Sequence, residues 1–159
     1  MHGEPIQFQE TETVLVVESS HQVRTLLSAI LEGAHFSVEC ATTAPEAMQK
    51  IEKGRFSAIL VEATNPYGQR SLLSDIAGRQ PDVLPRVIAV TSVIRTSRFH
   101  TELAQMDLFG TLRKPFDVLE LLDAVNGCAA SARLQLSLPP PRPVGAGRKS
   151  TLVRLPFSS

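Results

Sequence analysis

The feature that most constrains this chain is an unbroken apolar run, Ala58 to Val61, that ends in the acidic residue Glu62. A short run without polar interruption is typical of a strand covered on both faces, because a half-exposed strand would alternate. Asn65-Pro66 follows within a few residues and favours a turn. The stretch therefore predicts a buried strand that carries an acidic side chain to the loop at its end.

Three further stretches have the same character and also end in polar residues. They are Thr13 to Ser19, Arg86 to Ser92 and Leu108 to Pro115. A weakly alternating run from Phe36 to Cys40 predicts one more short strand. Helical patterns lie between these runs, such as the single apolar stripe from Val23 to Leu31. Helices are expected at about residues 20–33, 43–54, 72–78, 96–106 and 117–130.

Capping residues support the first two helix starts. Ser19 or Ser20 is placed to cap the first helix, because a serine hydroxyl accepts a hydrogen bond from the first-turn N–H groups. Thr43 and Glu46 form a capping-box pattern for the second helix. Pro45 lies inside its first turn, where the missing N–H has no partner to lose.

Strands that alternate with helices at this spacing predict an α/β fold. The expected architecture is a doubly wound, five-stranded parallel sheet flanked by five helices on both of its faces. In such a fold the functional crevice lies beyond the carboxyl ends of the strands. The polar residues that end the strands are therefore expected to meet along one edge of the sheet.

We expect three segments, which are residues 1–11 as an N-terminal extension, 12–130 as the folded domain and 131–159 as a disordered tail. The tail is rich in Pro, Gly and basic residues and too poor in apolar residues to pack. The formal net charge is zero, yet no Asp or Glu follows residue 123. Two interpretations of the basic tail stay open. It is either solvated without a dedicated partner, or attached electrostatically to an anionic surface such as the domain itself.

Composition narrows the class of protein. Hydrophobic residues make up 43% and charged residues 20% of the chain, as in soluble globular proteins. We recognise neither a membrane-spanning run nor a signal peptide, so a cytoplasmic location is expected. Cys40 and Cys128 have no metal-site spacing and are predicted to be free thiols. Because no membrane-spanning run is recognised, a membrane is not expected as a partner. Without a zinc motif or helix-turn-helix signature, a nucleic acid is not expected either.

Four segments together resemble a known family. VLVVES, VEATNP, VIAVTS and LRKPF occur here in the order and at the spacing of the receiver domain of response regulators, the CheY-like family. The resemblance covers residues 13–129. It implies the flavodoxin-like receiver fold and a role in two-component, or phosphorelay, signal transduction.

The resemblance also assigns roles to single positions. Glu62 stands where the family has its phosphoaccepting Asp. Glu18 and Ser19 stand at the acidic pair that helps to hold Mg²⁺. Thr91 and Lys114 match the positions that contact the phosphoryl group, and Pro115 follows Lys114. Thr111 stands at the aromatic switch position. The chain therefore departs from the family pattern at Glu62, Ser19 and Thr111.

These departures weaken the family's chemistry. Mg²⁺ requires oxygen ligands in near-octahedral geometry, and Ser19 replaces a charged ligand with a neutral hydroxyl. Glu62 is longer than Asp by one carbon–carbon bond, ~1.5 Å, and an error of about 1 Å in a reacting atom can reduce the rate on the order of 100-fold. We therefore expect no useful phosphorylation, no catalytic residue, no bound metal at Glu18 and Glu62, and no cofactor.

The longer side chain allows a further hypothesis. Glu62 can extend toward the space that a phosphoryl group would fill and meet Lys114 and Thr91 there, which would fix the domain in one state. The alternative is a partly buried acid that Lys114 merely satisfies.

The leading interpretation is a degenerate receiver, or pseudo-receiver, that is not an enzyme and signals by protein–protein interaction without phosphate. Its partners would be signalling proteins bound through the face formed by the fourth helix, fifth strand and fifth helix, with a homodimer as another occupant. One alternative is a receiver still phosphorylated by a histidine kinase with Mg²⁺. A second alternative is a nucleotide- or flavin-binding module on the same architecture.

Overall fold

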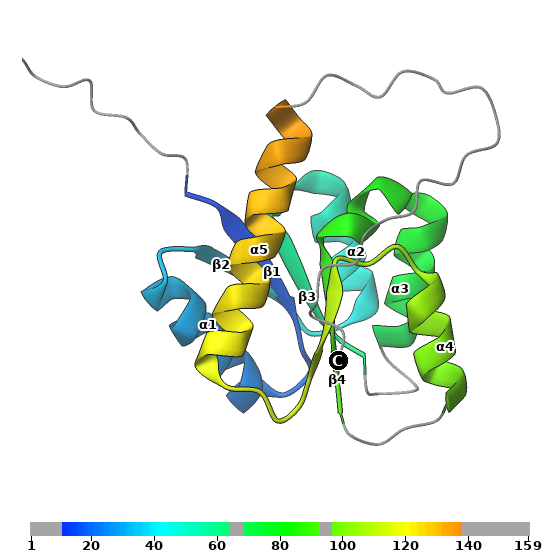
Figure 1. Cartoon of the computed structure of the whole chain (residues 1–159), viewed down its shortest axis with the longest axis horizontal. Coiled ribbons are helices and arrows are strands. Elements are labelled where there is room, and N and C mark those ends of the chain that lie inside the picture. The colour runs from blue at the N-terminus through cyan, green and yellow to red at the C-terminus, as the bar shows by residue number, and fades with distance from the viewer. Residues whose placement is uncertain (1–10, 64–68, 93–96, 138–159) are drawn as a thin grey trace, which may run out of the picture.

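The chain forms a five-stranded, all-parallel sheet with helices on both faces (Figure 1). The computed structural model describes residues 11–63, 69–92 and 97–137. The strand order is β2-β1-β3-β4-β5, so β2 and β5 form the two edges of the sheet. The strands are β1 (Thr13–Val17), β2 (Ser37–Ala41), β3 (Ala58–Glu62), β4 (Val87–Thr91) and β5 (Gly110–Arg113). The predicted fold class is confirmed.

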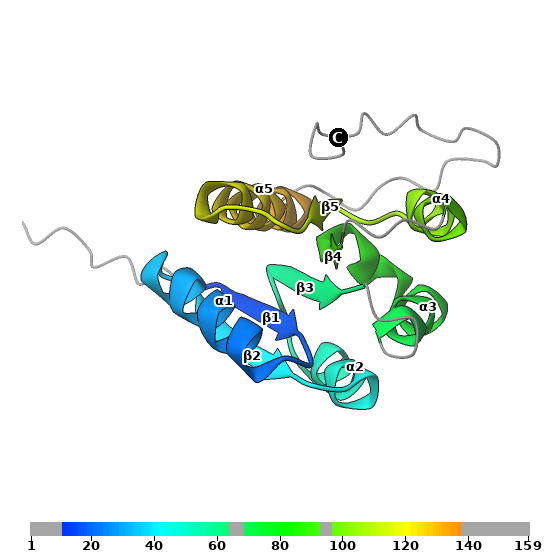
Figure 2. The same cartoon turned by 90° about the horizontal axis from the view of Figure 1, so that it is seen from below.

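The helices divide between the two faces of the sheet (Figure 2). One face is covered by α1 (His21–Gly33) and α5 (Val118–Ser137). The other face is covered by α2 (Ala44–Lys53), α3 (Gln69–Arg79) and α4 (Ser97–Gln105). A 3-10 helix, η1 (Pro81–Arg86), leads into β4. Each face has its own apolar core, which is the arrangement that a doubly wound sheet requires.

The apolar runs explain which strands lie at the centre. All the residues of β3 and β4 are buried, in agreement with their unbroken apolar sequences. Edge strand β2 alternates between exposed and partly buried residues before it ends at buried Ala41. Apolar side chains on α1 and α5 fill the core on their face, and Leu31 and Leu121 are fully buried there.

Both expected helix caps are present. The hydroxyl of Ser20 accepts a hydrogen bond of 3.4 Å from the N–H of Val23 at the start of α1. The hydroxyl of Thr43 accepts one of 3.3 Å from the N–H of Glu46 at the start of α2. The Glu46 carboxylate reaches back to the N–H and hydroxyl of Thr42, each at 3.1 Å, instead of the N–H of Thr43.

The expected end of the last helix at Ala130 was wrong, because α5 continues to Ser137. The extra turns bury Ala132, a small side chain that gives little hydrophobic pattern to read. Arg133 also forms an ion pair with Glu12, which precedes β1. The ladder of β5 begins at Gly110 instead of Leu108, although the N–H of Phe109 already donates to the carbonyl of Val87 at 3.0 Å.

Some predictions lie outside the described residues. They concern the N-terminal extension up to residue 10, the Asn65-Pro66 turn and the tail from residue 138 onward. Among the helices that the structure describes, none is long and apolar enough to cross a membrane.

Candidate functional site

The parallel register brings the ends of four strands to one edge of the sheet. Val17 of β1 pairs with Val61 of β3. Glu18 and Glu62 are the next residues along the chain, so they lie at the ends of two neighbouring strands. Thr91 ends β4, and Lys114 follows β5 directly. The N–H of Lys114 donates to the carbonyl of Thr91 at 2.7 Å, which fixes these two residues beside each other.

Polar side chains are buried at this edge. Glu18, Glu62 and Thr91 are 5%, 8% and 4% exposed, in a sheet whose other buried residues are apolar. Buried polar groups are costly unless they have partners, so such a cluster commonly marks a site. We refer to Glu18, Glu62, Thr91 and Lys114 as the acidic edge.

Charged groups of the acidic edge act on Glu18. Burial raises the pKa of Glu18, and the charge of Glu62 raises it further. A hydrogen bond of 3.1 Å from the N–H of Ser20, the ammonium of Lys114 and the guanidinium of Arg24 act in the opposite direction. Burial prevails, so the pKa of Glu18 lies above its ordinary value.

The contacts of Glu62 bear on the hypothesis of a fixed pair with Lys114. Ion pairs between described side chains include Lys50–Glu39, Arg79–Glu52 and Arg133–Glu12. Glu62 has an interaction of its own in the structure, and Lys114 lies near enough to act on the charge of Glu18. The pairing of Glu62 with Lys114 stays a hypothesis.

The remaining predicted positions lie around the acidic edge. Ser19 is exposed in the loop between β1 and α1. Thr111 is half-buried on β5, opposite Ala89. Pro115 follows Lys114 through a cis peptide bond. Ser92, after β4, has a buried hydroxyl oxygen without a hydrogen-bond partner among the described residues.

Arg24 is a site residue that the sequence patterns did not reveal. Its Nη1 donates to the main-chain carbonyl of Glu18 at 2.8 Å and to that of Ser19 at 2.9 Å. An arginine on an amphipathic helix is normally solvated, so its residue type gave no signal. Its position one turn after the Ser20 cap is the only clue, because that turn faces back toward the preceding loop.

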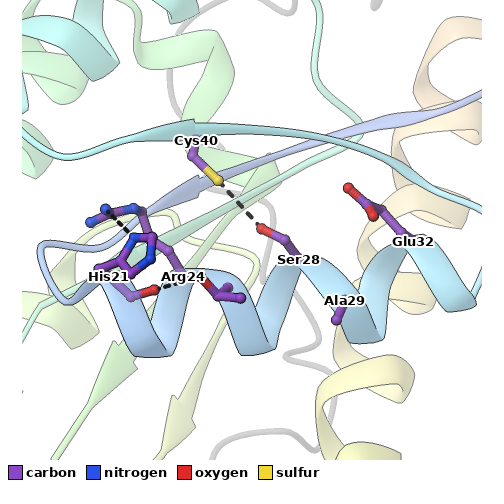
Figure 3. A pocket seen from close by; sticks show the side chains of 7 residues that line it. His21, Arg24, Ser28, Ala29, Glu32 and Cys40 are labelled. Atoms are coloured by element: carbon purple, nitrogen blue, oxygen red, sulfur yellow. Dashed lines mark hydrogen bonds between the residues drawn. The ribbon is translucent and has the colours of Figure 1, made fainter.

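A shallow groove lined by Arg24 runs along α1 on the side of edge strand β2 (Figure 3). Its volume is about 510 Å³, and His21 and Arg24 lie at one end with Glu32 at the other. The hydroxyl of Ser28 and the thiol of Cys40 are 3.4 Å apart across it, which joins α1 to edge strand β2. The residues that line the groove are not those of the acidic edge, but Arg24, which is one of them, also donates to the carbonyls of Glu18 and Ser19.

The donor set is a test of whether the acidic edge suits a metal. Three or more His, Cys, Asp or Glu side chains do not gather at any place in the described part of the chain. One oxygen of Glu18 already accepts the N–H of Ser20, and the carbonyls of Glu18 and Ser19 accept Arg24. Mg²⁺ takes an octahedral set of oxygens, usually one or two carboxylates with several waters. With the guanidinium of Arg24 on both loop carbonyls, the donor set at the acidic edge fits Mg²⁺ poorly.

Comparisons with known proteins agree with this architecture. The family model described as "Response regulator receiver domain" matches residues 14–126. Among curated proteins, no sequence match was found.

Solved structures match over most of the chain. A CheY-like response regulator receiver domain protein from Methanospirillum hungatei has a TM-score of 0.69 at 21% identity, covering 79% of this chain and 98% of that one. The receiver domain of a signal transduction histidine kinase from Syntrophus aciditrophicus has 0.69 at 21%, covering 81% and 98%. An adenylate cyclase from Rhodopirellula baltica has 0.69 at 21%, covering 80% and 93%. At this identity, the likeness establishes the shared fold.

Proposed function

The chain belongs to the response regulator receiver domain family, and we propose that it signals through protein contacts without being phosphorylated. It is a receiver domain of signal transduction whose acceptor position is changed. The observation that carries the proposal is Glu62, a buried glutamate at the end of β3 where the family pattern has an aspartate.

Positioning is the physical reason for loss of phosphoryl transfer. The reaction relies almost entirely on in-line placement and on charge stabilisation. Glu62 ends a fully buried strand, so its backbone has little room to retreat and offset the extra ~1.5 Å of side chain. Ser19 adds a second defect, because a hydroxyl brings no charge to a metal site.

Mg²⁺ and other cofactors are not part of this proposal. The carboxylate of Glu18 and the carbonyls beside it already accept protein hydrogen bonds. A metal at the two carbonyls would compete with the guanidinium of Arg24 for their oxygens. The proposed module therefore catalyses no reaction and holds Thr91 and Lys114 as remnants of a phosphoryl-binding site.

The face formed by α4, β5 and α5 is the proposed partner surface. On α5, Leu119 is 71% exposed and Val118 about half exposed, which is unusual for apolar side chains of this size. Another signalling protein is the proposed occupant, with a second copy of the chain as the alternative. Self-association by sedimentation would separate them: Leu119→Glu weakens a homodimer, whereas Leu26→Glu on α1, 60% exposed, is the matched control.

Incubation with acetyl phosphate and Mg²⁺, followed by intact mass, tests the central claim. The expected result is an unchanged mass for the whole chain, with a functional receiver domain as the positive control. A phosphoryl adduct that disappears in Glu62→Ala would overturn the proposal and favour a receiver that is still phosphorylated. Absorbance and a thermal-shift screen with nucleotides and flavins test the second alternative from another class.

A further inference from the structure

Arg24 places a fixed positive charge on the loop between β1 and α1. Its guanidinium extends from the first turns of α1 and donates from one nitrogen to two successive carbonyls, those of Glu18 and Ser19. Its second terminal nitrogen lies 3.4 Å from Nδ1 of His21, also on α1 (Figure 3). The side chain therefore ties the helix to the loop that precedes it.

This charge lies where negative charge is concentrated. Arg24 acts electrostatically on Glu18, and it also lowers the pKa of Glu46 on α2 after the larger effects of Thr42 and Lys50. Glu18 in turn is coupled to buried Glu62. An arginine cannot lose its proton in a protein, so this positive charge is permanent.

Ordering an acidic loop is a task that a divalent ion performs in many proteins, by drawing carboxylate and carbonyl oxygens together. Here the guanidinium already draws the carbonyls of Glu18 and Ser19 together, and Ser20 donates its N–H to the Glu18 carboxylate. A second cation would have to compete with these contacts and with the charge of Arg24.

We propose that Arg24 is a resident cation that holds the β1–α1 loop ordered and makes the acidic edge independent of divalent ions. This inference rests on the proposed function, and it names the residue that keeps the site in one state. Arg24 is a positioning residue, since it acts on the loop and not on a ligand. Removing its guanidinium should loosen the loop and leave Glu18 and Glu62 open to Mg²⁺.

Native-state amide exchange of the full, isotope-labelled chain tests the proposal. The reporting amides are Ser20, which donates to Glu18, and Val23, which donates to the Ser20 hydroxyl. Wild type, Arg24→Ala and Arg24→Lys are compared without and with millimolar Mg²⁺, at constant ionic strength so that screening stays equal. Thr25→Ala is the matched control, because Thr25 lines the same groove but bonds only within α1.

In wild type we expect the exchange rates of both amides to be the same with and without Mg²⁺. In Arg24→Ala exchange should rise on the order of 10-fold or more, because charge-assisted hydrogen bonds are lost, while core amides of β1 stay unchanged. Mg²⁺ should then slow it again, and Arg24→Lys should fall between, since Lys is a point charge without the planar fork.

Three results would overturn the inference. They are equal exchange in wild type and Arg24→Ala, a Mg²⁺ response in wild type as large as in Arg24→Ala, and a loosened Arg24→Ala loop that Mg²⁺ leaves unchanged. The last result would make Arg24 a structural contact only. None of them depends on the acetyl phosphate experiment, so the proposed function and this inference can fail separately.

Discussion

Glu18 is buried beside Glu62 at the ends of neighbouring strands. Its own burial raises the pKa of Glu18, and the charge of Glu62 raises it further. Two acids in such a position are unfavourable for folding when both are charged. Lys114 and Arg24 offset part of this repulsion. The charged form of Glu18 therefore lowers the free energy of unfolding, and mutation or a change of pH can measure this loss.

Glu18→Gln should raise the free energy of unfolding at pH 7. A raised pKa means that protonated Glu18 favours the folded state, so this stability is present at acidic pH and is lost as the pH rises through the folded pKa. Gln is neutral at every pH and still accepts the N–H of Ser20. Urea unfolding at pH 7 and near pH 4 measures the effect, which should shrink in acid.

The matched control for this comparison is Glu32→Gln. Glu32 is exposed on α1, the helix that follows the loop of Glu18, so its replacement should change stability by less than about 0.5 kcal/mol. A Glu18→Gln variant that is no more stable than wild type at pH 7, or equally stabilised at both pH values, would contradict the assigned cause.

Thr43→Ala should lower the free energy of unfolding by about 1 kcal/mol, because the hydroxyl that accepts the N–H of Glu46 caps α2. Thr25→Ala is the comparison, since the Thr25 hydroxyl donates to the His21 carbonyl within α1 and should contribute less than about 0.5 kcal/mol. Equal losses for the two variants, measured by denaturant unfolding, would argue against a capping role.

Only Cys40 should react with a thiol reagent in the folded protein. Burial raises the pKa of Cys128 to about 12, and its thiol donates to the carbonyls of Ser57 and Arg86. Because the thiolate is the reactive form, Cys128 stays inert at pH 8 until the chain unfolds. Mass spectrometry of labelled wild type and Cys40→Ser checks this; rapid labelling of folded Cys40→Ser would contradict it.

Much of the fold was predictable because its central strands are buried on both faces. The apolar run of β3 predicted the bounds that the structure has, and β4 lies within the stretch expected from Arg86 to Ser92. The end of α5 was not predictable, since small residues such as Ala132 fill the space under its last turns. An apolar stripe is visible in sequence only where large side chains make the contact.

The acidic edge followed from topology, since parallel strands present their carboxyl ends together. Glu18, Glu62, Thr91 and Lys114 could therefore be placed without coordinates. Arg24 could not, because it binds main-chain carbonyls, and no pattern of residue types encodes the path of a loop.

The strongest test of the changed acceptor is to restore it. Ser19→Asp with Glu62→Asp supplies a second acid in the β1–α1 loop and shortens the acceptor by ~1.5 Å. Thr91 and Lys114 remain beside each other through the 2.7 Å bond from the Lys114 N–H. With acetyl phosphate and Mg²⁺, the double variant should gain a phosphoryl group at least on the order of 100-fold faster than wild type, measured by intact mass.

Each change alone should restore less, because metal binding and positioning fail for separate reasons and both are required. The triple variant that adds Lys114→Ala is the control, since it removes the ammonium expected to face the phosphoryl oxygens. A double variant that stays unmodified would mean that more than Ser19 and the acceptor has changed, either at Thr91 and Lys114 or because Arg24 still competes with Mg²⁺ for the loop carbonyls. Adduct formation in the triple variant as fast as in the double variant would remove Lys114 from that site.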